Sequence, residues 1–181
     1  MAVTRDVRPV CLVALIILIV AVVTPLLWRA RLVSTGPEIE IVFLNGTRRS
    51  VTLAEMKRLP VLERRGSYQN QYGNWRDEGV YRGVPLLDLI GRGADYAKLE
   101  VTADDGYHIE IERARVEDED YPMILAYTLD GVSVPAWESG FRIAVLPADG
   151  AVSNDEYRTT SAGSFWAQNV RRLALLASTH P

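Results

Sequence analysis

Hydrophobic and polar residues alternate along several short stretches of this chain, as they do in β-strands that bury one face. The segment 38–44, with the sequence EIEIVFL, follows this pattern strictly. The Asn45-Gly46 pair that comes next is a strong signal for a type I′ hairpin turn, and it predicts a return strand over about 47–51. The same reasoning predicts a second hairpin and three later strands, at 98–103, 107–111, 123–129, 141–146 and within 165–177.

Two short helices are predicted between these strands. Thr52 and Glu55 stand at the spacing of a capping box, which predicts a helix that starts there and runs to about Leu59. The sequence LLDLIGRG, with Pro85 near its first turn, predicts the second helix. Many short strands with two short helices predict an α+β fold, a strand-rich mixed domain, over residues 38–177.

Long polar segments interrupt this pattern at 66–82 and 147–164, and each is predicted to be a long loop, the first with strand pieces at either end. Long loops within a compact domain are usually functional or mobile, so these two segments are candidate site regions. A third polar segment, 113–120, ends in the acidic run Glu117–Asp120. It lacks the alternating ligands and the glycine of an EF-hand loop, so we expect a solvated acidic loop there.

Residues 10–28 form an uncharged, strongly apolar run of 19 residues, VCLVALIILIVAVVTPLLW. At ~1.5 Å rise per residue, a helix of this length nearly spans a ~30 Å hydrocarbon core, which predicts one transmembrane helix before the domain. The competing interpretation is a cleaved signal peptide, but the sequence WRARLVSTG that follows offers no A-x-A cleavage pattern. We therefore expect a single-pass anchor with a short tail at 1–9 and a linker at 29–37, and a second tail at 178–181 after the domain.

The orientation of this anchor follows from its place in the chain. Arginines flank the apolar run on both sides, so the positive-inside rule gives little asymmetry. A short N-terminal tail followed by a large domain favours a signal-anchor. The chain is therefore expected to be a membrane protein whose domain is extracytoplasmic.

Composition narrows the chemistry that the domain can perform. A formal net charge of −3 gives no global electrostatic reason to expect nucleic acid as a partner. The single cysteine, Cys11, lies in the apolar run, which excludes an intrachain disulfide, a zinc-thiolate site and a catalytic cysteine from the remainder. His108 and His180 are the only histidines, and His108 is expected on the solvent face of its strand. Neither a multi-histidine metal site nor a Ser-His-Asp triad is therefore expected.

Groups suited to a flat, anionic ligand gather in the two long polar segments and the strand that follows them, and we expect the segments to face each other across one concave site. Guanidinium groups offer planar forks to phosphate, and Trp or Tyr rings offer stacking faces. Ordinary loop composition explains the same residues, so the pattern alone leaves both interpretations open. The candidates for cofactor binding are Asn70, Asn74, Trp75, Arg76, Arg158, Trp166, Asn169 and Arg171.

Five blocks of the sequence, in the same order, resemble the molybdopterin-binding domain of the sulfite oxidase family. They are EIEIVFLNGTRRSVTLAEMKRLP, Trp75 through GVYRGVPLLDLI, LEVTADDGYHIEI, ILAYTLDGVSVPAWESGFRIAVLP and FWAQNVRRLALL, and they cover roughly 38–177. The resemblance implies a fold of the sulfite-oxidase molybdopterin-binding type, a molybdopterin cofactor, oxidoreductase chemistry and a membrane or redox partner protein. It also adds Arg142, which keeps the place of the family's arginine in the sequence SGFR, to the candidate cofactor contacts.

One departure from the family pattern bears directly on the chemistry. Family enzymes carry a cysteine in the first polar segment, shortly before Gly-Asn, and its thiolate ligates molybdenum. Here Asn70 stands about where that cysteine belongs, and a neutral carboxamide is a poor substitute for a thiolate on a high-valent metal centre. Two hypotheses follow. One is a membrane-anchored domain that binds molybdopterin or a related anionic pterin, either with redox activity or without it. The other is a non-enzymatic binding or accessory module that retains the fold and has lost the cofactor.

Overall fold

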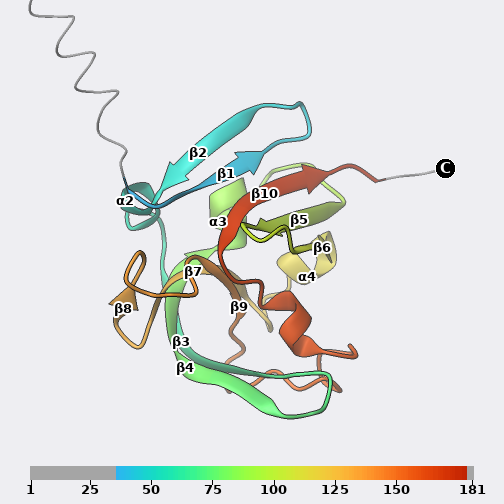
Figure 1. Cartoon of the computed structure of the whole chain (residues 1–181). Coiled ribbons are helices and arrows are strands. Elements are labelled where there is room, and N and C mark those ends of the chain that lie inside the picture. The colour runs from blue at the N-terminus through green and yellow to red at the C-terminus, as the bar shows by residue number, and fades with distance from the viewer. Residues whose placement is uncertain (1–35, 179–181) are drawn as a thin grey trace, which may run out of the picture. The chain divides into compact units, whose positions relative to one another are not determined.

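Two β-sheets of five strands each make up the domain, which the computed structural model describes over residues 36–178 (Figure 1). The anchor predicted at 10–28 lies outside the described residues. Within 36–178, every helix is too short or too polar to cross a bilayer.

The first sheet, sheet A, joins the start of the domain to its end. In spatial order its strands are β2 (Arg48–Thr52), β1 (Glu38–Val42), β10 (Val170–Leu176), β5 (Lys98–Ala103) and β6 (His108–Glu112). β1 and β10 pair in parallel, with Ile41 opposite Leu173, and the other pairings are antiparallel. Both predicted hairpins, over 38–51 and 98–111, are confirmed as neighbours within this sheet.

All named strand pairs of the second sheet, sheet B, are antiparallel. In spatial order its strands are β3 (Leu62–Gln69), β4 (Trp75–Pro85), β7 (Met123–Leu129) and β8 (Val132–Ser133), with β9 (Arg142–Val145) also paired to β7. The strands predicted at 123–129 and 141–146 are therefore confirmed. The final predicted strand is confirmed as well, although it begins at Val170 rather than near 165.

The long loop predicted over 66–82 is confined to the turn at 70–74, and the strand pieces expected at its two ends are confirmed as parts of β3 and β4, which pair as a hairpin (Figure 1). Several of its core-facing positions are glycines, so the hairpin lacks the alternating apolar side chains that signal a strand. Neighbouring atoms occupy the space that a Cβ would need. At Gly66 a Cβ would lie 2.5 Å from Leu146 Cδ2, and at Gly83 it would lie 2.2 Å from the Leu125 carbonyl oxygen. Close packing thus explains why the strand signal is weak here.

Short helices connect the strands. The predicted capping box is confirmed, since the Glu55 amide donates to the Thr52 hydroxyl at 3.2 Å and the Thr52 amide donates to the Glu55 carboxylate at 2.8 Å. The second predicted helix follows Pro85, as expected. Residues 113–116 form a helical turn, and the acidic run 117–120 follows it outside any helix or strand, as the expected loop. The helices are α2 (Leu53–Met56), α3 (Leu86–Ile90), α4 (Arg113–Val116) and the 3₁₀ turn η1 (Ala162–Phe165).

One cluster of buried apolar residues contains members of both sheets. Alternate residues of sheet A are buried, such as Ile39 and Ile41 in β1. In β7, at the centre of sheet B, the consecutive residues 123–127 are all buried, so this strand is covered on both faces. The core therefore positions β7 and the strands that pair with it, including β4 and β9.

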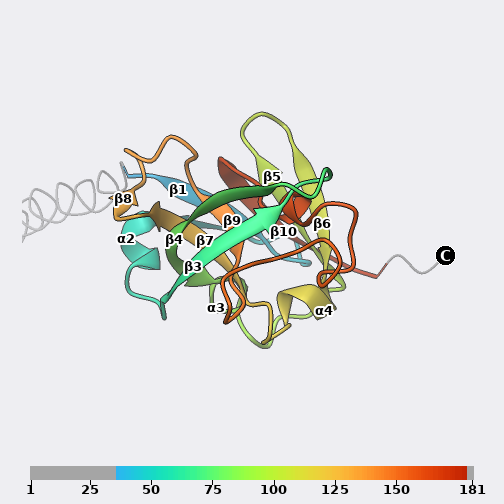
Figure 2. The same cartoon turned by 90° about the horizontal axis from the view of Figure 1, so that it is seen from below.

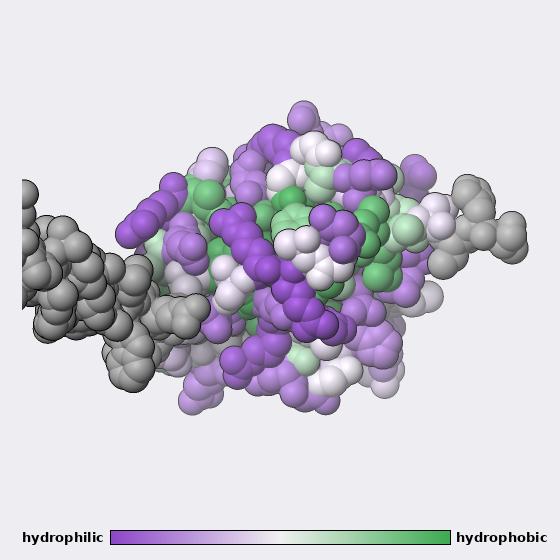
Figure 3. All heavy atoms as spheres, turned by 90° about the horizontal axis from the view of Figure 1, so that it is seen from above, coloured by the Kyte–Doolittle hydropathy of each residue, from purple (hydrophilic) through white to green (hydrophobic). Residues whose placement is uncertain are grey.

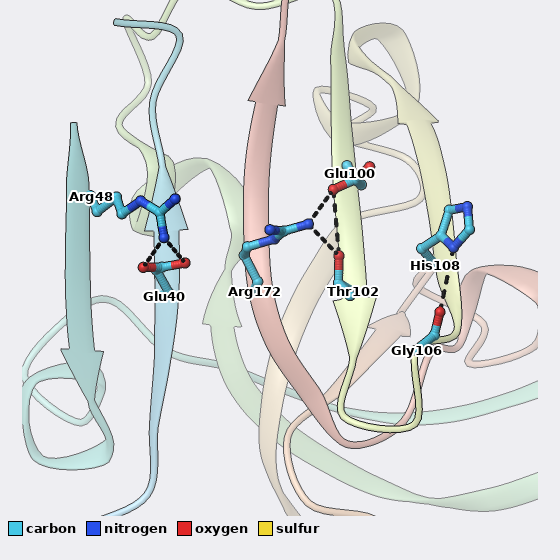
Figure 4. A network of polar contacts seen from close by, with 7 residues as sticks. All are labelled: Glu40, Arg48, Glu100, Thr102, Gly106, His108 and Arg172. Atoms are coloured by element: carbon cyan, nitrogen blue, oxygen red, sulfur yellow. Dashed lines mark hydrogen bonds and ion pairs between the residues drawn. The ribbon is translucent and has the colours of Figure 1, made fainter. Parts of the chain in front are cut away.

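The outer face of sheet A is polar, and its side chains pair across neighbouring strands. Arg48 binds Glu40 at 3.2 Å, and Arg172 binds Glu100 at 2.9 Å (Figure 4). His108 lies exposed on the same face, as predicted. Seen from above, hydrophilic side chains dominate the surface of the domain, with apolar ones showing between them (Figure 3). These ion pairs are at least partly exposed to solvent, and pairs of this kind add little stability.

Gly83→Ala is expected to destabilise the chain, because the added Cβ would meet a backbone carbonyl that cannot rotate away. The expected loss in the free energy of unfolding is about 3 kcal/mol, the upper part of the range for overpacked cores. Urea unfolding of the purified chain, followed by tryptophan fluorescence, measures it. Gly93→Ala is the control, because its Cβ meets nothing within 4 Å. It should change stability by less than about 0.5 kcal/mol, and equal losses in the two variants would contradict the packing described.

Candidate functional site

Asn70, the residue near the place of the family's cysteine, is a turn residue in this structure. Its side-chain Oδ1 accepts hydrogen bonds from the amides of Tyr72 at 3.0 Å and Asn74 at 3.1 Å. Its own amide donates to the Asn74 carbonyl oxygen at 3.0 Å. Asn side chains commonly close turns in this way. Because Oδ1 is engaged by two backbone amides, Asn70 presents no ligand atom to a metal.

The two segments predicted to face each other across a concave site meet edge to edge at this point. Val152, in the segment after β9, forms a parallel bridge with Tyr68. The Gln69 amide donates to the Val152 carbonyl oxygen, and the Val152 amide donates to the Ser67 carbonyl oxygen, both at 3.0 Å. Figure 2 shows this segment, in orange, running beside β3. The structure therefore brings the two segments together. Backbone hydrogen bonds join them directly at this point, where the sequence predicted that they would face each other across a concave site.

Arg142 lies at the centre of the cluster that these segments enclose. Its side chain, on β9, is only 2% exposed. The rings of Trp166, Tyr68 and Tyr81 surround it, with centroids 5.6, 5.8 and 6.0 Å from the guanidinium carbon. The rings also pack against one another, since the ring centroid of Trp166 lies 4.9 Å from that of Tyr68 and 5.1 Å from that of Tyr81. Cation–π contacts of this kind are favourable when the cation is removed from water.

Asp77, which the sequence analysis did not single out, neutralises this buried cation. In the β3–β4 ladder Gly66 pairs with Gly79 and Tyr68 pairs with Arg76, so Asp77 and its neighbour form a β-bulge in β4. Asp77 has a φ of 51°, in the left-handed region that few non-glycine residues adopt. A bulge re-aims the side chains around it, and here the Asp77 carboxylate contacts Nη2 of Arg142.

Two phenol hydroxyls hold Asp77 in this position. Tyr68 donates to its carboxylate at 3.0 Å, and Tyr81 donates to its backbone carbonyl oxygen at 2.6 Å. Burial raises the pKa of both phenols above its ordinary value, while the positive charge of Arg142 opposes that rise. Both hydroxyls therefore stay protonated and donate at neutral pH. A single Asp in a polar stretch gave no sequence signal for this role, because nothing local marks the bulge.

The remaining predicted residues lie away from Arg142, except for Trp166. Trp75, Arg76 and Arg158 are exposed, and Arg158 has a φ of 48°. Asn74 is part of the β3–β4 turn. The structure thus leaves these four side chains on the surface of the hairpin and of the segment that packs against it.

Asn169 and Arg171 line a separate pocket of about 290 Å³. Trp137 and Phe141 give this pocket buried aromatic walls. Arg171 is largely exposed, and its Nη2 lies 3.5 Å from the carboxylate of Asp104. The volume is at the lower end of the range for small-molecule pockets. The predicted cofactor contacts are therefore divided between this pocket, the Arg142 cluster and the surface.

The residues present do not fit a molybdopterin site. Asn70 closes a turn where the thiolate would be needed, Arg142 already faces a carboxylate, and Trp166 is buried in ring contacts. Among the described residues, no three His, Cys, Asp or Glu side chains are grouped closely enough to hold a metal ion.

Comparisons with known proteins agree with the observed fold. No family model and no curated protein matches the chain. Among solved structures, 27 chains match it, and one of them is the sulfane dehydrogenase SoxCD from Paracoccus pantotrophus, with a TM-score of 0.56 and 16% sequence identity. The match covers 78% of this chain but 38% of that one, so this chain spans well under half of that protein's matched chain. At this identity the likeness shows the fold alone, and the predicted strand-rich mixed domain resembles a part of that dehydrogenase.

Proposed function

We propose that this chain is a membrane-anchored domain with a sulfite-oxidase-like fold that works as a non-enzymatic binding or accessory module. The likeness to a sulfane dehydrogenase and the five sequence blocks support the relation to oxidoreductases of this fold. The observation that carries the proposal is the engagement of Asn70 in the β3–β4 turn, because it replaces the thiolate that molybdenum chemistry requires. An accessory role implies a partner protein at the same membrane.

The competing hypothesis is a domain that binds molybdopterin or a related anionic pterin. The same fold likeness and the same sequence blocks support it. It requires Arg142 to exchange its carboxylate partner for the ligand, and Trp166, which is 3% exposed, to leave its packed position. Both changes disrupt a buried cluster, which is why we place the accessory role first.

Cofactor content separates the two hypotheses. The full-length chain, purified from a host that makes molybdopterin, is expected to carry far less than one molybdenum per chain and to release no fluorescent pterin on oxidation. It should also reduce no electron acceptor when sulfite is supplied. A sulfite oxidase purified from the same host controls for cofactor supply. Near-stoichiometric molybdenum, or sulfite-dependent turnover, would contradict the accessory role.

Asn70→Cys introduces a thiol near the place of the family's cysteine, but it does not introduce the supporting groups that a metal site needs. It removes the acceptor for two turn amides, so the free energy of unfolding should fall by about 1 kcal/mol. We expect no sulfite oxidation from this variant, because a productive site also needs its supporting groups. Asn70→Asp keeps an acceptor for both amides and is the matched control, expected within about 0.5 kcal/mol of wild type. Urea unfolding and a sulfite assay make the measurements, and a stable, active cysteine variant would be the contrary result.

The membrane anchor is a separate part of the proposal, motivated by the uncharged run at 10–28. Protease added to intact spheroplasts is expected to digest the domain while a cytoplasmic control protein stays protected. The chain should leave the membrane fraction with detergent but not with alkaline carbonate. Full protection of the domain, under conditions that digest an extracytoplasmic control, would overturn the orientation.

A further inference from the structure

The strand β2 leaves one edge of sheet A open. It is an end strand of that sheet, and no strand of the described residues pairs with its outer side (Figure 1). Its register against β1 is continuous from Arg48 to Thr52, without a bulge, and residues 48–50 are exposed. An edge of this kind presents free backbone N–H and C=O groups to any extended segment that comes alongside.

The hydrogen-bond pattern of the β1–β2 ladder shows which backbone groups of β2 face outward. The Phe43 amide donates to the Thr47 carbonyl oxygen at 2.9 Å, so these two residues form a bonded pair. Bonded pairs alternate along an antiparallel ladder, so the backbone groups of Arg48 and Ser50 point away from β1. In agreement with this, the Thr52 amide donates to the carboxylate of the capping box, at 2.8 Å. The open edge is therefore centred on Arg48 and Ser50.

The edges of sheet B are covered or short. Backbone hydrogen bonds with Val152 cover the end of β3. The outer side of β9 is covered in the same way, because the Ile143 amide donates to the Ala167 carbonyl oxygen at 2.9 Å. The strand β8 consists of Val132 and Ser133 alone. Covering and shortening are common ways to prevent strand pairing at an edge, and β2 has neither.

Positive charge lies beside the open edge. Arg48 pairs with Glu40 on the polar face of sheet A, whereas Arg49 points to the other face, is exposed and belongs to no ion pair among residues 36–178. Arg58, which follows α2, is also exposed. Hydrogen bonds of the capping box hold the pKa of Glu55 below its usual value, and the positive charges of Arg49 and Arg58 add to this effect. Both guanidinium groups therefore lie near the same end of β2.

We propose that the outer edge of β2 is the docking site for an extended, acidic segment of a partner protein, which joins sheet A as an antiparallel strand. The backbone of the segment pairs with the outward groups of Arg48 and Ser50, as in other cases of strand addition. The residue opposite Arg49 then belongs to a non-hydrogen-bonded pair, in which side chains lie closest. A carboxylate at that position meets the guanidinium of Arg49, so the charge of the edge selects an acidic partner.

This inference deepens the proposed accessory role by naming the kind of partner, and it rests on that role for its biological use. The two can fail separately. Molybdenum content and sulfite turnover test the accessory role. Peptide binding at β2 tests the docking site and is unaffected by the outcome of those assays.

The experiment measures how a short synthetic peptide binds to the full-length chain in detergent. The peptide alternates threonine with glutamate, which places every carboxylate on one face of the strand that it forms. It carries a fluorescent label, and binding is followed by fluorescence anisotropy. Wild type is expected to bind this peptide at least about 10-fold more tightly than a version with lysine in place of glutamate, because several cross-strand charge pairs change sign. No binding, or equal affinity for the two peptides, would overturn the proposal.

Two variants separate the charge from the backbone. Arg49→Glu should weaken peptide binding about 5-fold or more, because an attractive cross-strand pair becomes a repulsive one. Ser50→Pro removes an outward amide at an edge position, where proline is tolerated, and should weaken binding by a similar factor. Unchanged affinity in either folded variant would overturn the proposal.

Hydrogen exchange tests the backbone pairing without any substitution, so the test does not depend on the folding of the proline variant. Bound peptide should slow amide exchange in the segment 48–52 of wild type, as measured by mass spectrometry, because pairing protects the outward amides. Exchange in this segment that is unchanged at saturating peptide would contradict strand addition.

Each variant has a matched control. Arg76→Glu makes the same change in charge on the exposed part of the β3–β4 hairpin. Glu110→Pro makes the proline change in β6, the other end strand of sheet A, at a residue whose amide also faces outward. Both controls should bind the acidic peptide within about 2-fold of wild type. A loss in either control equal to that in its matched variant would overturn the proposal, because the effect would then not be specific to β2.

A second copy of this chain is the alternative occupant of the same edge. Light scattering coupled to size-exclusion chromatography, in detergent and without peptide, is expected to give a monomer for wild type. A dimer that Ser50→Pro dissociates would overturn the assignment to a partner segment, because the edge would then be filled by self-pairing.

Discussion

The ion pair between Arg142 and Asp77 holds the two flanks of sheet B to each other. Arg142 comes from β9 and Asp77 from β4, and these two strands lie on opposite sides of β7. Loss of one partner from a buried pair leaves an uncompensated charge, at a cost of about 3–5 kcal/mol. The three rings around the guanidinium can pack as they do because that charge is neutralised. The position of the β3–β4 hairpin therefore depends on an electrostatic contact as well as on the apolar core.

Close approach of backbones is the second constraint on this region. Gly83 sits against the backbone of β7, and Gly163 sits against the ring of Tyr68, where a Cβ would lie 2.4 Å from Cε2. These glycines let the hairpin, β7 and the segment after β9 come within reach of Arg142. The cluster is thus assembled from parts that carry little hydrophobic signal in the sequence, and its side chains meet only because the backbones around them are so close.

Local patterns predicted most of the strands, because alternation, a hairpin turn and a capping box each depend on neighbouring residues. The β3–β4 hairpin was predicted only as strand pieces at the ends of a long loop, since its inward positions are partly glycine and give a weak strand pattern. The ion pair of Arg142 with Asp77 could not be predicted from the residues next to either of them in the sequence. It depends on a bulge that turns Asp77 inward, and the register of a bulge is set by the partner strand. Resemblance to a family drew attention to Asn70 and Arg142, but it did not predict the partners of these side chains, which are the Tyr72 and Asn74 amides and the Asp77 carboxylate.

The pairing of β1 with β10 joins two strands of sheet A that lie far apart in the sequence. β10 lies in the middle of sheet A, between β1 and β5, although it comes last in sequence among the described strands. Sheet B draws its named strands from 62–145, so all of them are synthesised before the strand that completes sheet A. Contacts between the two ends of a chain are slow to form, because a long loop must close before they are gained. The last described strand is therefore a central member of its sheet, and loss of residues from this end would divide sheet A rather than trim its edge.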